Sequence, residues 1–336
     1  MKLDPDTAQG VLDSLRRMQL VGPDEEPPIT PLTGGVSSLI VRVDTVASGP
    51  LCLKRALPQL KVAALWEAPV QRNRAEVLWM QVAGQIVPHA VPAILGHDPQ
   101  DNSFAMAYLE PADYPVWKQQ LLSGVADPKT ASALGQLLVA IHSATAGSAA
   151  MAERFANDAN FYALRLEPYF VETARRHPEC AAVLLRLVDT TAGCKRALVH
   201  GDVSPKNILV GPHGPVLLDA ECAWYGDPAF DLAFCLNHLL LKSVPRPSAS
   251  GDYLRCFNAL ASSYLAQVEW EPAAQLEQRA AALLAALLLA RIDGKSPVEY
   301  ITTEADRDRV RRAAIPMLRS GVGNLAELVD CWNTAA

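Results

Sequence analysis

The sequence lacks a basic excess, a membrane-length apolar run and a cysteine pattern, and each absence excludes a class of protein. Lys and Arg number 30 against 36 Asp and Glu, which argues against a nucleic-acid partner. The longest apolar run, 280–290, is bounded by Arg279 and Arg291. A membrane span needs about 20 apolar residues, so we expect a buried helix here and no membrane partner. The first residues, M-K-L-D-P-D-T, also lack the basic-then-apolar order of a secretory signal.

The seven cysteines are scattered, odd in number and never spaced as C-x-x-C. This distribution disfavours a disulfide framework and a zinc site, and it predicts small core residues in a protein of the reducing cytoplasm. Half of the 336 residues are apolar and a fifth are charged, as in ordinary globular proteins. Because a chain of this length exceeds one core of usual size, we expect two lobes.

The N-terminal third has the pattern of a small antiparallel sheet accompanied by helices. Apolar periodicity predicts helices at 7–18 and 68–83. Short alternating runs separated by turns predict strands between 29 and 57 and at 103–111. We place the lobe boundary directly after this last strand.

The boundary divides the chain into an N-terminal lobe, 1–110, and a mainly helical C-terminal lobe, 111–336. Within the second lobe, short apolar runs predict a return to strands between 196 and 219. The Pro-rich segment 243–251 is expected to be a surface loop between helices. The helices are predicted at 130–142, 166–176, 179–189 and from after Gly226 to the end.

The densest polar segment in an apolar setting is A-L-V-H-G-D-V-S-P-K-N-I-L-V, which holds Asp202 and Asn207. It is followed by L-L-D-A-E, which places Asp219 and Glu221 at the end of another strand. A hairpin would hold the carboxylates and the amide close together. This set suits Mg²⁺ and phosphoryl transfer, because one carboxylate can accept the proton of an attacking hydroxyl while the amide and the other carboxylate hold metal.

The pattern H-G-D-x-x-P-x-N-I-L, then D-x-E, then G-D-P-x-x-D-L-A resembles the aminoglycoside phosphotransferase and choline kinase family. The resemblance implies an α+β, protein-kinase-like fold of two lobes, with a small N-terminal antiparallel β lobe and a large, mainly helical C-terminal lobe. It implies that Asp202 is the catalytic base and that Asn207 and Asp219 bind Mg²⁺. Glu221 would assist a second metal or the acceptor.

The same resemblance assigns supporting roles around this motif. His200 would brace the catalytic loop, and Asp231 would hold the loop through its backbone. Ser204 would lie near the γ-phosphate, and Lys206 is expected to face solvent.

The N-terminal lobe is similar to the same family, and its L-T-G-G-V-S-S segment is close to the G-G-x-S-N of methylthioribose kinases. The resemblance implies that Lys54 contacts the α- and β-phosphates and that Glu76 pairs with Lys54, with Glu67 as the alternative partner. Arg55 should point to the opposite face of the strand. Phosphate binding is expected from the loop residues Gly34, Gly35, Ser37 and Ser38. The adenine pocket is expected from Met106 and from backbone groups of Tyr108, Leu109 and Glu110.

Acceptor binding is expected in the C-terminal lobe. A long apolar helix ends in R-I-D-G-K, which clusters Arg291, Asp293 and Lys295 at a glycine turn. These charges either bind the acceptor or serve as ordinary partners of a helix end. Trp224 lies close in sequence to the metal ligands and either forms an apolar wall for the acceptor or packs in the core.

We interpret the sequence as an ATP- and Mg²⁺-dependent kinase that phosphorylates a hydroxyl group of a small molecule, with GTP not excluded as donor. The favoured acceptor is a metabolite such as a sugar, an amino alcohol or a nucleoside-like compound. An antibiotic-inactivating kinase is the alternative, although no strongly acidic cluster suited to an aminoglycoside is present. A nucleotide-binding pseudokinase is the third reading, and the intact set of Lys54, Asp202, Asn207 and Asp219 argues against it. The sequence leaves the oligomeric state open.

Overall fold

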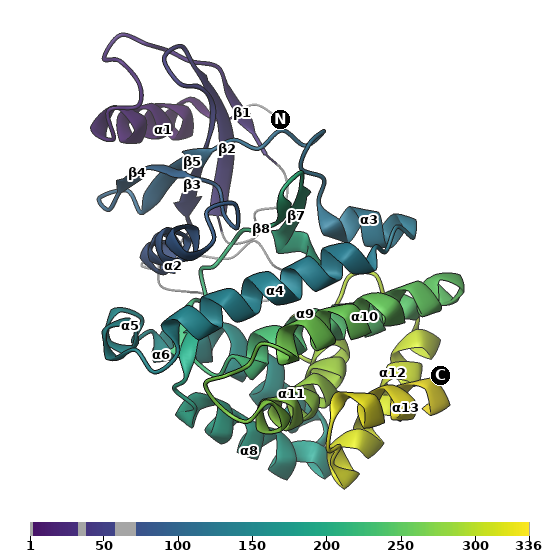
Figure 1. Ribbon diagram of the computed structural model, residues 1–336. Helices are drawn as coiled ribbons and strands as arrows, with labels where there is room; N and C mark the ends of the chain where they lie inside the picture. The colour runs from purple at the N-terminus through teal and green to yellow at the C-terminus, as the bar shows by residue number, and fades with distance from the viewer. Residues whose placement is uncertain (1–2, 33–37, 58–71, 336) are drawn as a thin grey trace.

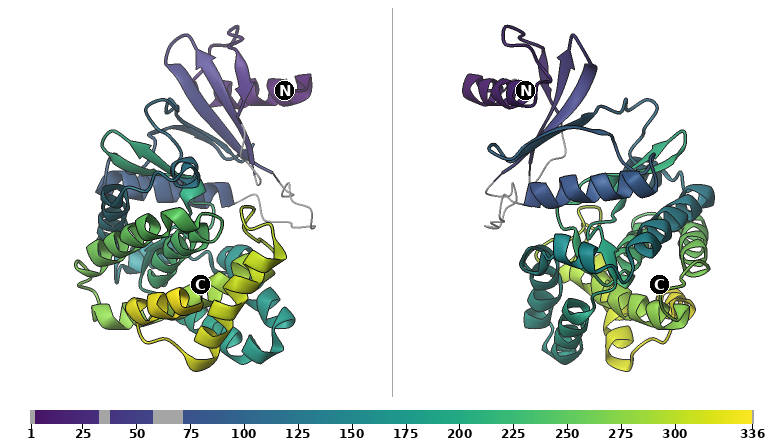
Figure 2. Two further views of the ribbon diagram at one scale, coloured as in Figure 1. Left: turned by 90° about the vertical axis from the view of Figure 1, so that its right-hand side faces the viewer. Right: turned by 60° about the vertical axis from the view of Figure 1, so that its left-hand side comes forward.

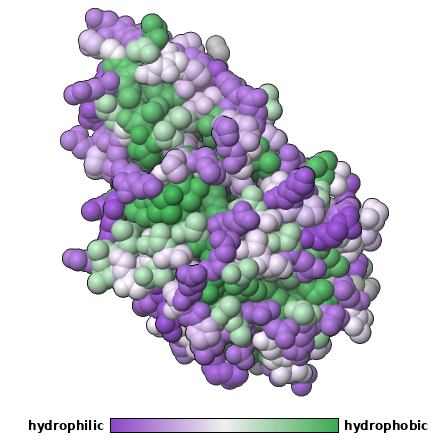
Figure 3. Space-filling model, viewed as in Figure 1, coloured by the Kyte–Doolittle hydropathy of each residue, from purple (hydrophilic) through white to green (hydrophobic). Residues whose placement is uncertain are grey.

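The computed structural model describes residues 3–32, 38–57 and 72–335, and these form two lobes of unequal size. The smaller lobe contains the N-terminal sheet, and the larger lobe is mainly helical (Figure 1). The space-filling view in Figure 3 shows the narrowing between them. The fold class expected from the sequence is therefore correct. The boundary placed at 110/111 lies between the last strand of the sheet and the first helix of the larger lobe, and it remains a prediction.

The small lobe is built on an antiparallel sheet with the strand order β1-β2-β3-β5-β4. The strands are β1 (Ile29–Pro31), β2 (Ser38–Thr45), β3 (Gly49–Ala56), β4 (Ile94–Asp98) and β5 (Ser103–Ala107). Side chains alternate across β3, so Leu51 and Leu53 pack against one face while Cys52 and Lys54 face the other. Arg55 lies on the same face as the two leucines, as expected, and contacts Asp101 at 2.5 Å.

A helix covers each face of this sheet. Helix α1 (Pro5–Arg17) places Val11 and Leu15 against the leucines of β3. It begins two residues earlier than expected because Asp4 caps it, accepting a hydrogen bond from the Thr7 amide at 2.9 Å. Helix α2 (Arg72–Ile86) lies toward the large lobe. It corresponds to the helix expected at 68–83, of which 68–71 lie outside the described residues.

The large lobe packs its helices around α9 (Ala229–Ser243), whose residues are all buried (Figures 1 and 2). The other helices are α3 (Trp117–Ser123), α4 (Pro128–Thr145), α5 (Ala149–Arg154), α6 (Asp158–Phe161), α7 (Glu172–Arg176), α8 (Pro178–Gly193), α10 (Ser250–Leu265), α11 (Ala273–Asp293), α12 (Glu304–Ser320) and α13 (Leu325–Ala335). A π-helix, η1 (Tyr162–Val171), precedes α7, so the helix expected at 166–176 is not one regular α-helix. Short 3-10 turns form η2 (Pro205–Asn207) and η3 (Pro247–Ala249).

Two small two-stranded sheets in the large lobe carry the polar motif. One pairs β7 (Ile208–Gly211) with β8 (Gly214–Leu217), as the sequence predicts. The other pairs β6 (Ala197–Val199) with β9 (Trp224–Gly226), and β9 was not expected as a strand. Because β9 returns beside β6, the polar residues on either side of these strands are drawn together.

The apolar stretch at 280–290 lies within α11, where ten of its eleven residues are buried, as expected for a core helix. By length and composition alone, α11 is the one helix in the described ranges that could cross a membrane, and most of it lies inside the fold. Within the segment 243–251, the exposed residues are Pro245 to Ser248 and Gly251, because α9 extends to its start and α10 begins at Ser250.

Candidate active site

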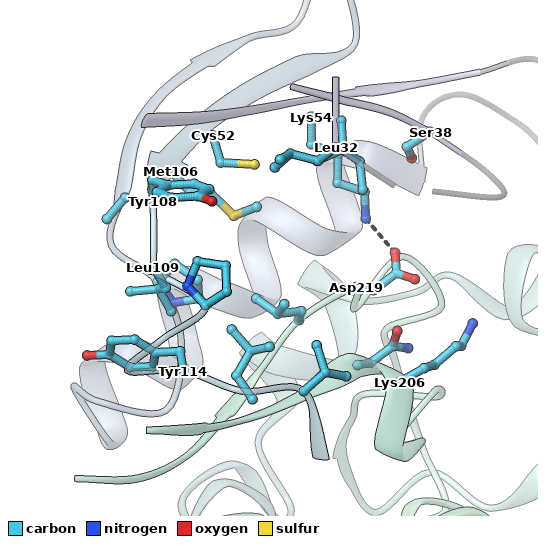
Figure 4. A pocket seen from close by; sticks show the side chains of 18 of the residues that line it. Leu32, Ser38, Cys52, Lys54, Met106, Tyr108, Leu109, Tyr114, Lys206 and Asp219 are labelled. Atoms are coloured by element: carbon cyan, nitrogen blue, oxygen red, sulfur yellow. Dashed lines mark hydrogen bonds and ion pairs between the residues drawn. The ribbon is translucent and has the colours of Figure 1, made fainter. Parts of the chain in front are cut away.

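A cavity of about 400 Å³ lies between the two lobes (Figure 4). Its walls are largely apolar, with Ile40 and Met106 from the sheet and Leu209 and Leu218 from the large lobe. At its polar end are Ser38, Lys54, Glu76, Lys206, Asn207 and Asp219. An apolar slot that ends in charged groups suits a planar base joined to phosphates.

Lys54 connects the two lobes at the polar end of this cavity. Its ammonium group is 2.7 Å from the Glu76 carboxylate of α2, and it also forms an ion pair with Asp219, which follows β8. Burial alone would lower the pKa of Lys54, but the carboxylates of Asp219 and Glu76 outweigh it and raise the pKa. The pairing of Lys54 with Glu76 expected from the sequence is present, and Lys54 is a fixed cation at neutral pH.

Asp202 is buried and is held between two cations. Its carboxylate lies 3.0 Å from Arg165 and 3.3 Å from Lys206. Burial would raise the pKa of Asp202, but Lys206 and Arg165 outweigh it and hold the pKa well below its usual range. Asp202 is therefore ionised at neutral pH. Lys206 was expected to face solvent; its side chain is half exposed, but its ammonium group contacts Asp202 and lines the cavity.

The loop that carries Asp202 is anchored by Asp231 at the start of α9. The buried Asp231 carboxylate accepts hydrogen bonds from the backbone amides of His200 at 2.7 Å and Gly201 at 2.8 Å. Gly201 has φ +80, and a Cβ there would lie 2.9 Å from Cys222. Only glycine fits this turn without strain.

His200 passes this restraint on to Asp202. Burial lowers the pKa of His200, so its ring is neutral. The ring Nδ1 then accepts the amide N–H of Asp202 at 3.1 Å, and Nε2 donates to the Leu218 carbonyl at 3.1 Å. The bracing roles expected for His200 and Asp231 are both visible in these contacts.

The expected metal ligands Asn207 and Asp219 line the same cavity. The Asn207 amide nitrogen donates to the Asp202 carbonyl at 3.1 Å, which leaves the amide oxygen for another partner. An amide oxygen and a carboxylate are the hard donors that Mg²⁺ takes, with phosphate and water completing its shell. These residues therefore fit the group, although the described part of the chain holds no cluster of three or more His, Cys, Asp or Glu that could bind a metal by itself.

Glu221 is placed differently from the other carboxylates. Its carboxylate lies 2.9 Å from the guanidinium of Arg72, at the first turn of α2. In this arrangement Glu221 links the two lobes by an ion pair. The sequence left its role between metal and acceptor, and both roles stay predictions.

The other residues expected at the nucleotide site differ in whether they line the cavity. Met106, Tyr108 and Leu109 line the cavity, whereas the Glu110 side chain is half exposed and contacts Arg42 at 3.3 Å. Ser204 is buried, and its hydroxyl has no hydrogen-bond partner within the described ranges. Three expected phosphate-loop residues, Gly34, Gly35 and Ser37, lie outside the described residues, as does Glu67.

The residues expected to bind the acceptor are not brought together. Trp224 is 1% exposed and stacks on Phe161 with ring centroids 4.1 Å apart, so it packs in the core. Asp293 is engaged by Arg311 at 2.6 Å and by His177 at 2.8 Å, which gives it a structural role. Lys295 pairs with Glu167 at 2.7 Å.

Arg291 is the member of that turn that points toward the catalytic side. Its guanidinium donates to the Tyr169 hydroxyl at 3.0 Å, and its charge contributes to the low pKa of Asp202 after those of Lys206 and Arg165. Sequence reasoning did not find Arg165, which lies 37 positions before Asp202 in a π-helix. No local pattern marks such a residue; only the packing of η1 against the catalytic loop brings it there.

Comparisons with known proteins agree with this geometry. The sequence matches the family described as the phosphotransferase enzyme family over residues 28–249. It is 27% identical over 343 residues to methylthioribose kinase of Erwinia tasmaniensis, covering 90% of this chain and 84% of that protein. Methylthioribose kinase of Yersinia pseudotuberculosis serotype O:3 is 24% identical over 244 residues, which cover 65% of this chain and 60% of the relative.

Two solved structures share the fold. Ethanolamine kinase of Plasmodium vivax aligns with a TM-score of 0.60 at 12% identity, covering 96% of this chain and 98% of that one. An aminoglycoside phosphotransferase of Alicyclobacillus acidocaldarius aligns with a TM-score of 0.51 at 14% identity, covering 100% and 97%. The two-lobed fold is thus shared with solved small-molecule kinases. Because the family match covers more than half of the chain, the protein is a member of the phosphotransferase enzyme family.

Proposed function

We propose that the protein transfers the γ-phosphoryl group of ATP, with Mg²⁺, to a hydroxyl group of a small-molecule acceptor. The observation that carries this proposal is the arrangement at one end of the interlobe cavity. Lys54, Asn207 and Asp219 line the cavity together, and the neighbouring loop holds the ionised Asp202. Phosphoryl transfer needs mainly positioning and charge stabilisation, and this set supplies both.

Each residue then has a defined task. The adenine ring would lie in the apolar slot beside Met106 and Leu218, and Lys54 would bind the phosphates. Asn207 and Asp219 would hold Mg²⁺, which supplies the charge neutralisation that the transferring phosphoryl group requires. Asp202 would orient the acceptor hydroxyl and accept its proton, because its low pKa keeps the carboxylate ionised at neutral pH.

The acceptor class rests on the relatives and on the intact site. Methylthioribose kinases are named for a sugar acceptor, which supports a metabolite over an antibiotic. The complete Lys54–Glu76 and Asn207–Asp219 set supports an enzyme over a pseudokinase. Seven unpaired cysteines support a reducing compartment such as the cytoplasm. The proposal includes no nucleic-acid or membrane partner.

The direct test is an ADP-release assay over hydroxylated metabolites and aminoglycosides, with ATP and GTP as alternative donors. Asp202→Asn and Asp202→Ala should abolish turnover while nucleotide affinity stays within a few-fold. Asp189→Asn, at an exposed position of α8, is the matched control and should behave as wild type. Near wild-type kcat in Asp202→Asn would refute the assigned base, and ADP release from no acceptor class would refute the enzyme.

A further inference from the structure

Helix α9 carries buried polar groups that the proposed reaction does not use. The ring nitrogen Nε2 of His238, both amide atoms of Asn237 and the ammonium group of Lys242 have no hydrogen-bond partner among the residues the structure describes. All three side chains are at least nine-tenths buried. Buried polar groups are normally hydrogen-bonded, because leaving one unpaired costs about 1–3 kcal/mol. These atoms therefore point to a ligand.

Arg291, which lies on α11, adds a further buried polar side chain to this group. Its Nε is also buried without a partner in the described ranges, while another nitrogen donates to the Tyr169 hydroxyl. The guanidinium carbon of Arg291 lies 5.5 Å from the centre of the Tyr169 ring, and that of Arg165 lies 5.8 Å from the same centre. Since Arg165 contacts Asp202 directly, a single aromatic ring separates Arg291 from a side chain that touches the catalytic carboxylate.

Lys242 and His238 are joined to this group through Tyr300. The ammonium group of Lys242 lies 4.0 Å from the centre of the Tyr300 ring, and the Tyr300 hydroxyl is 3.0 Å from Nδ1 of His238. Burial first, and then the cations Arg291 and Lys242, lower the pKa of His238 well below its usual value. Asp202 and Lys206 act on the same ring. We call His238, Lys242 and Arg291 the basic cluster, and its link to the catalytic loop runs from Arg291 through Tyr169 and Arg165.

The protein does not balance the charges of Arg291 and Lys242, and burial lowers the pKa of Lys242 to about 8. Neither Arg291 nor Lys242 has a carboxylate within 4.0 Å among the described residues, whereas most buried charges in proteins are paired. The nearby carboxylates are already engaged: Asp202 by Arg165 and Lys206, and Glu299 by Lys118 at 2.6 Å. An oxyanion from a bound molecule would supply the missing counter-charge.

We propose that the acceptor carries an oxyanion, a carboxylate or a phosphate monoester, which binds the basic cluster while its hydroxyl group lies at Asp202. This inference rests on the proposed function and names the acceptor class for the same site. An ammonium group in the acceptor would instead meet Arg291 and Lys242 and be repelled. The prediction that Arg291 binds the acceptor is thus retained with a definite chemistry, and the cluster replaces Asp293 and Lys295 as its partners.

The test uses four compounds with one three-carbon skeleton: glycerate, glycerol 3-phosphate, glycerol and 3-amino-1,2-propanediol. Binding is measured by isothermal titration calorimetry on the full chain saturated with ADP and Mg²⁺, so that the nucleotide cavity is filled. We expect saturable binding of at least one anionic compound, and much weaker binding of the neutral and ammonium compounds. The preferred anion shows whether a carboxylate or a phosphate is recognised. Binding of neither anion, or equal binding of glycerol, would overturn the inference.

Two variants locate the binding. Lys242→Met and Arg291→Gln should each weaken binding of the anion at least tenfold. Lys295→Gln, on the same turn as Arg291 but paired with Glu167, should leave it unchanged. Arg291→Gln also loses contacts to Tyr169 and Ser296, so Lys242→Met decides the matter if the first variant is unstable. Unchanged anion affinity in folded Lys242→Met would refute the proposal.

The experiments distinguish a failure of the anionic acceptor from a failure of the proposed kinase activity. A neutral or ammonium acceptor that is phosphorylated with an unchanged KM in Lys242→Met would leave the kinase activity standing and refute the anionic acceptor. Conversely, anion binding that depends on Lys242, without ADP release from any acceptor, would support the site and refute the kinase.

Discussion

Asp231 offers a sharp test of how the catalytic loop is held, because one buried carboxylate accepts hydrogen bonds from two successive backbone amides. Asp231→Asn keeps the size of the side chain but offers one acceptor oxygen and a donor in place of the second oxygen. One of the two amides, His200 or Gly201, then loses its bond and faces another N–H group. The change therefore removes one bond and adds an unfavourable contact.

The magnitude follows from burial. A hydrogen bond to a charged group contributes about 1.5–3 kcal/mol, and a buried donor left without a partner costs about 1–3 kcal/mol. Because Asp231 is 0% exposed, water cannot replace the lost partner. We expect the free energy of unfolding to fall by about 2–4 kcal/mol. Denaturant titration of the wild type and the variant measures this difference.

The catalytic consequence is separate from the loss of stability. His200 and Gly201 position Asp202, whereas Asp231 does not line the nucleotide cavity. In the folded variant, kcat should therefore fall at least tenfold while the KM for ATP changes little. Asp252→Asn, an exposed position at the start of α10 that pairs with Arg255, is the control and should change neither quantity. Lowered stability with full kcat would refute the positioning role, and unchanged stability would refute the energetic argument.

Three further predictions concern the other charged groups. Asp219→Ala should remove the Mg²⁺ dependence of ATP binding in calorimetry, and a retained dependence would contradict its assignment as a metal ligand. Glu76→Gln should lower kcat/KM for ATP, because Lys54 keeps its charge but loses the α2 carboxylate that positions it at 2.7 Å; unchanged kinetics would show that Asp219 positions Lys54 alone. Asp293→Asn should destabilise the protein by about 2 kcal/mol at pH 7 with the acceptor KM unchanged. Burial alone would raise the pKa of Asp293, but the hydrogen bonds and charges of Arg311 and His177 outweigh burial, so the net pKa is lowered. The contribution of Asp293 to the free energy of unfolding is therefore fully present above pH about 4, and it is lost as the pH falls through the folded-state pKa. The unfolding curves of wild type and variant should therefore converge in acid.

The sequence predicted those parts of the site whose residues lie close together in the chain. The alternation of β3 indicates that Lys54 and Arg55 face opposite sides, and the short spacing from Asp202 to Asn207 places both in the segment between β6 and β7. Partners supplied by distant segments were not predictable in this way. Arg165 reaches Asp202 from a π-helix, and Arg72 reaches Glu221 from the other lobe.

The residues expected to bind the acceptor show the same limit, although they all lie at the end of α11. Arg291, Asp293 and Lys295 lie within five consecutive positions of the sequence, and this proximity predicts a common task. Because successive positions at the end of α11 project in different directions, Arg291 meets Tyr169 while Asp293 meets α12. His238 and Lys242 lie in an apolar helix, where periodicity indicates only a core position.

Helix α9 also fixes the separation between the anchor of the catalytic loop and two members of the basic cluster. Asp231 anchors the catalytic loop at its first turn, and His238 and Lys242 follow seven and eleven residues later on the same rigid element. At about 1.5 Å per residue, these positions are roughly 10 Å and 16 Å farther along the axis. In the proposed complex, the place of the oxyanion along α9 relative to the anchored loop is thus fixed by the positions of His238 and Lys242. Moving Lys242 by one turn of α9 would shift that place by about 5.4 Å, while Asp231 and the loop that it anchors stay unchanged.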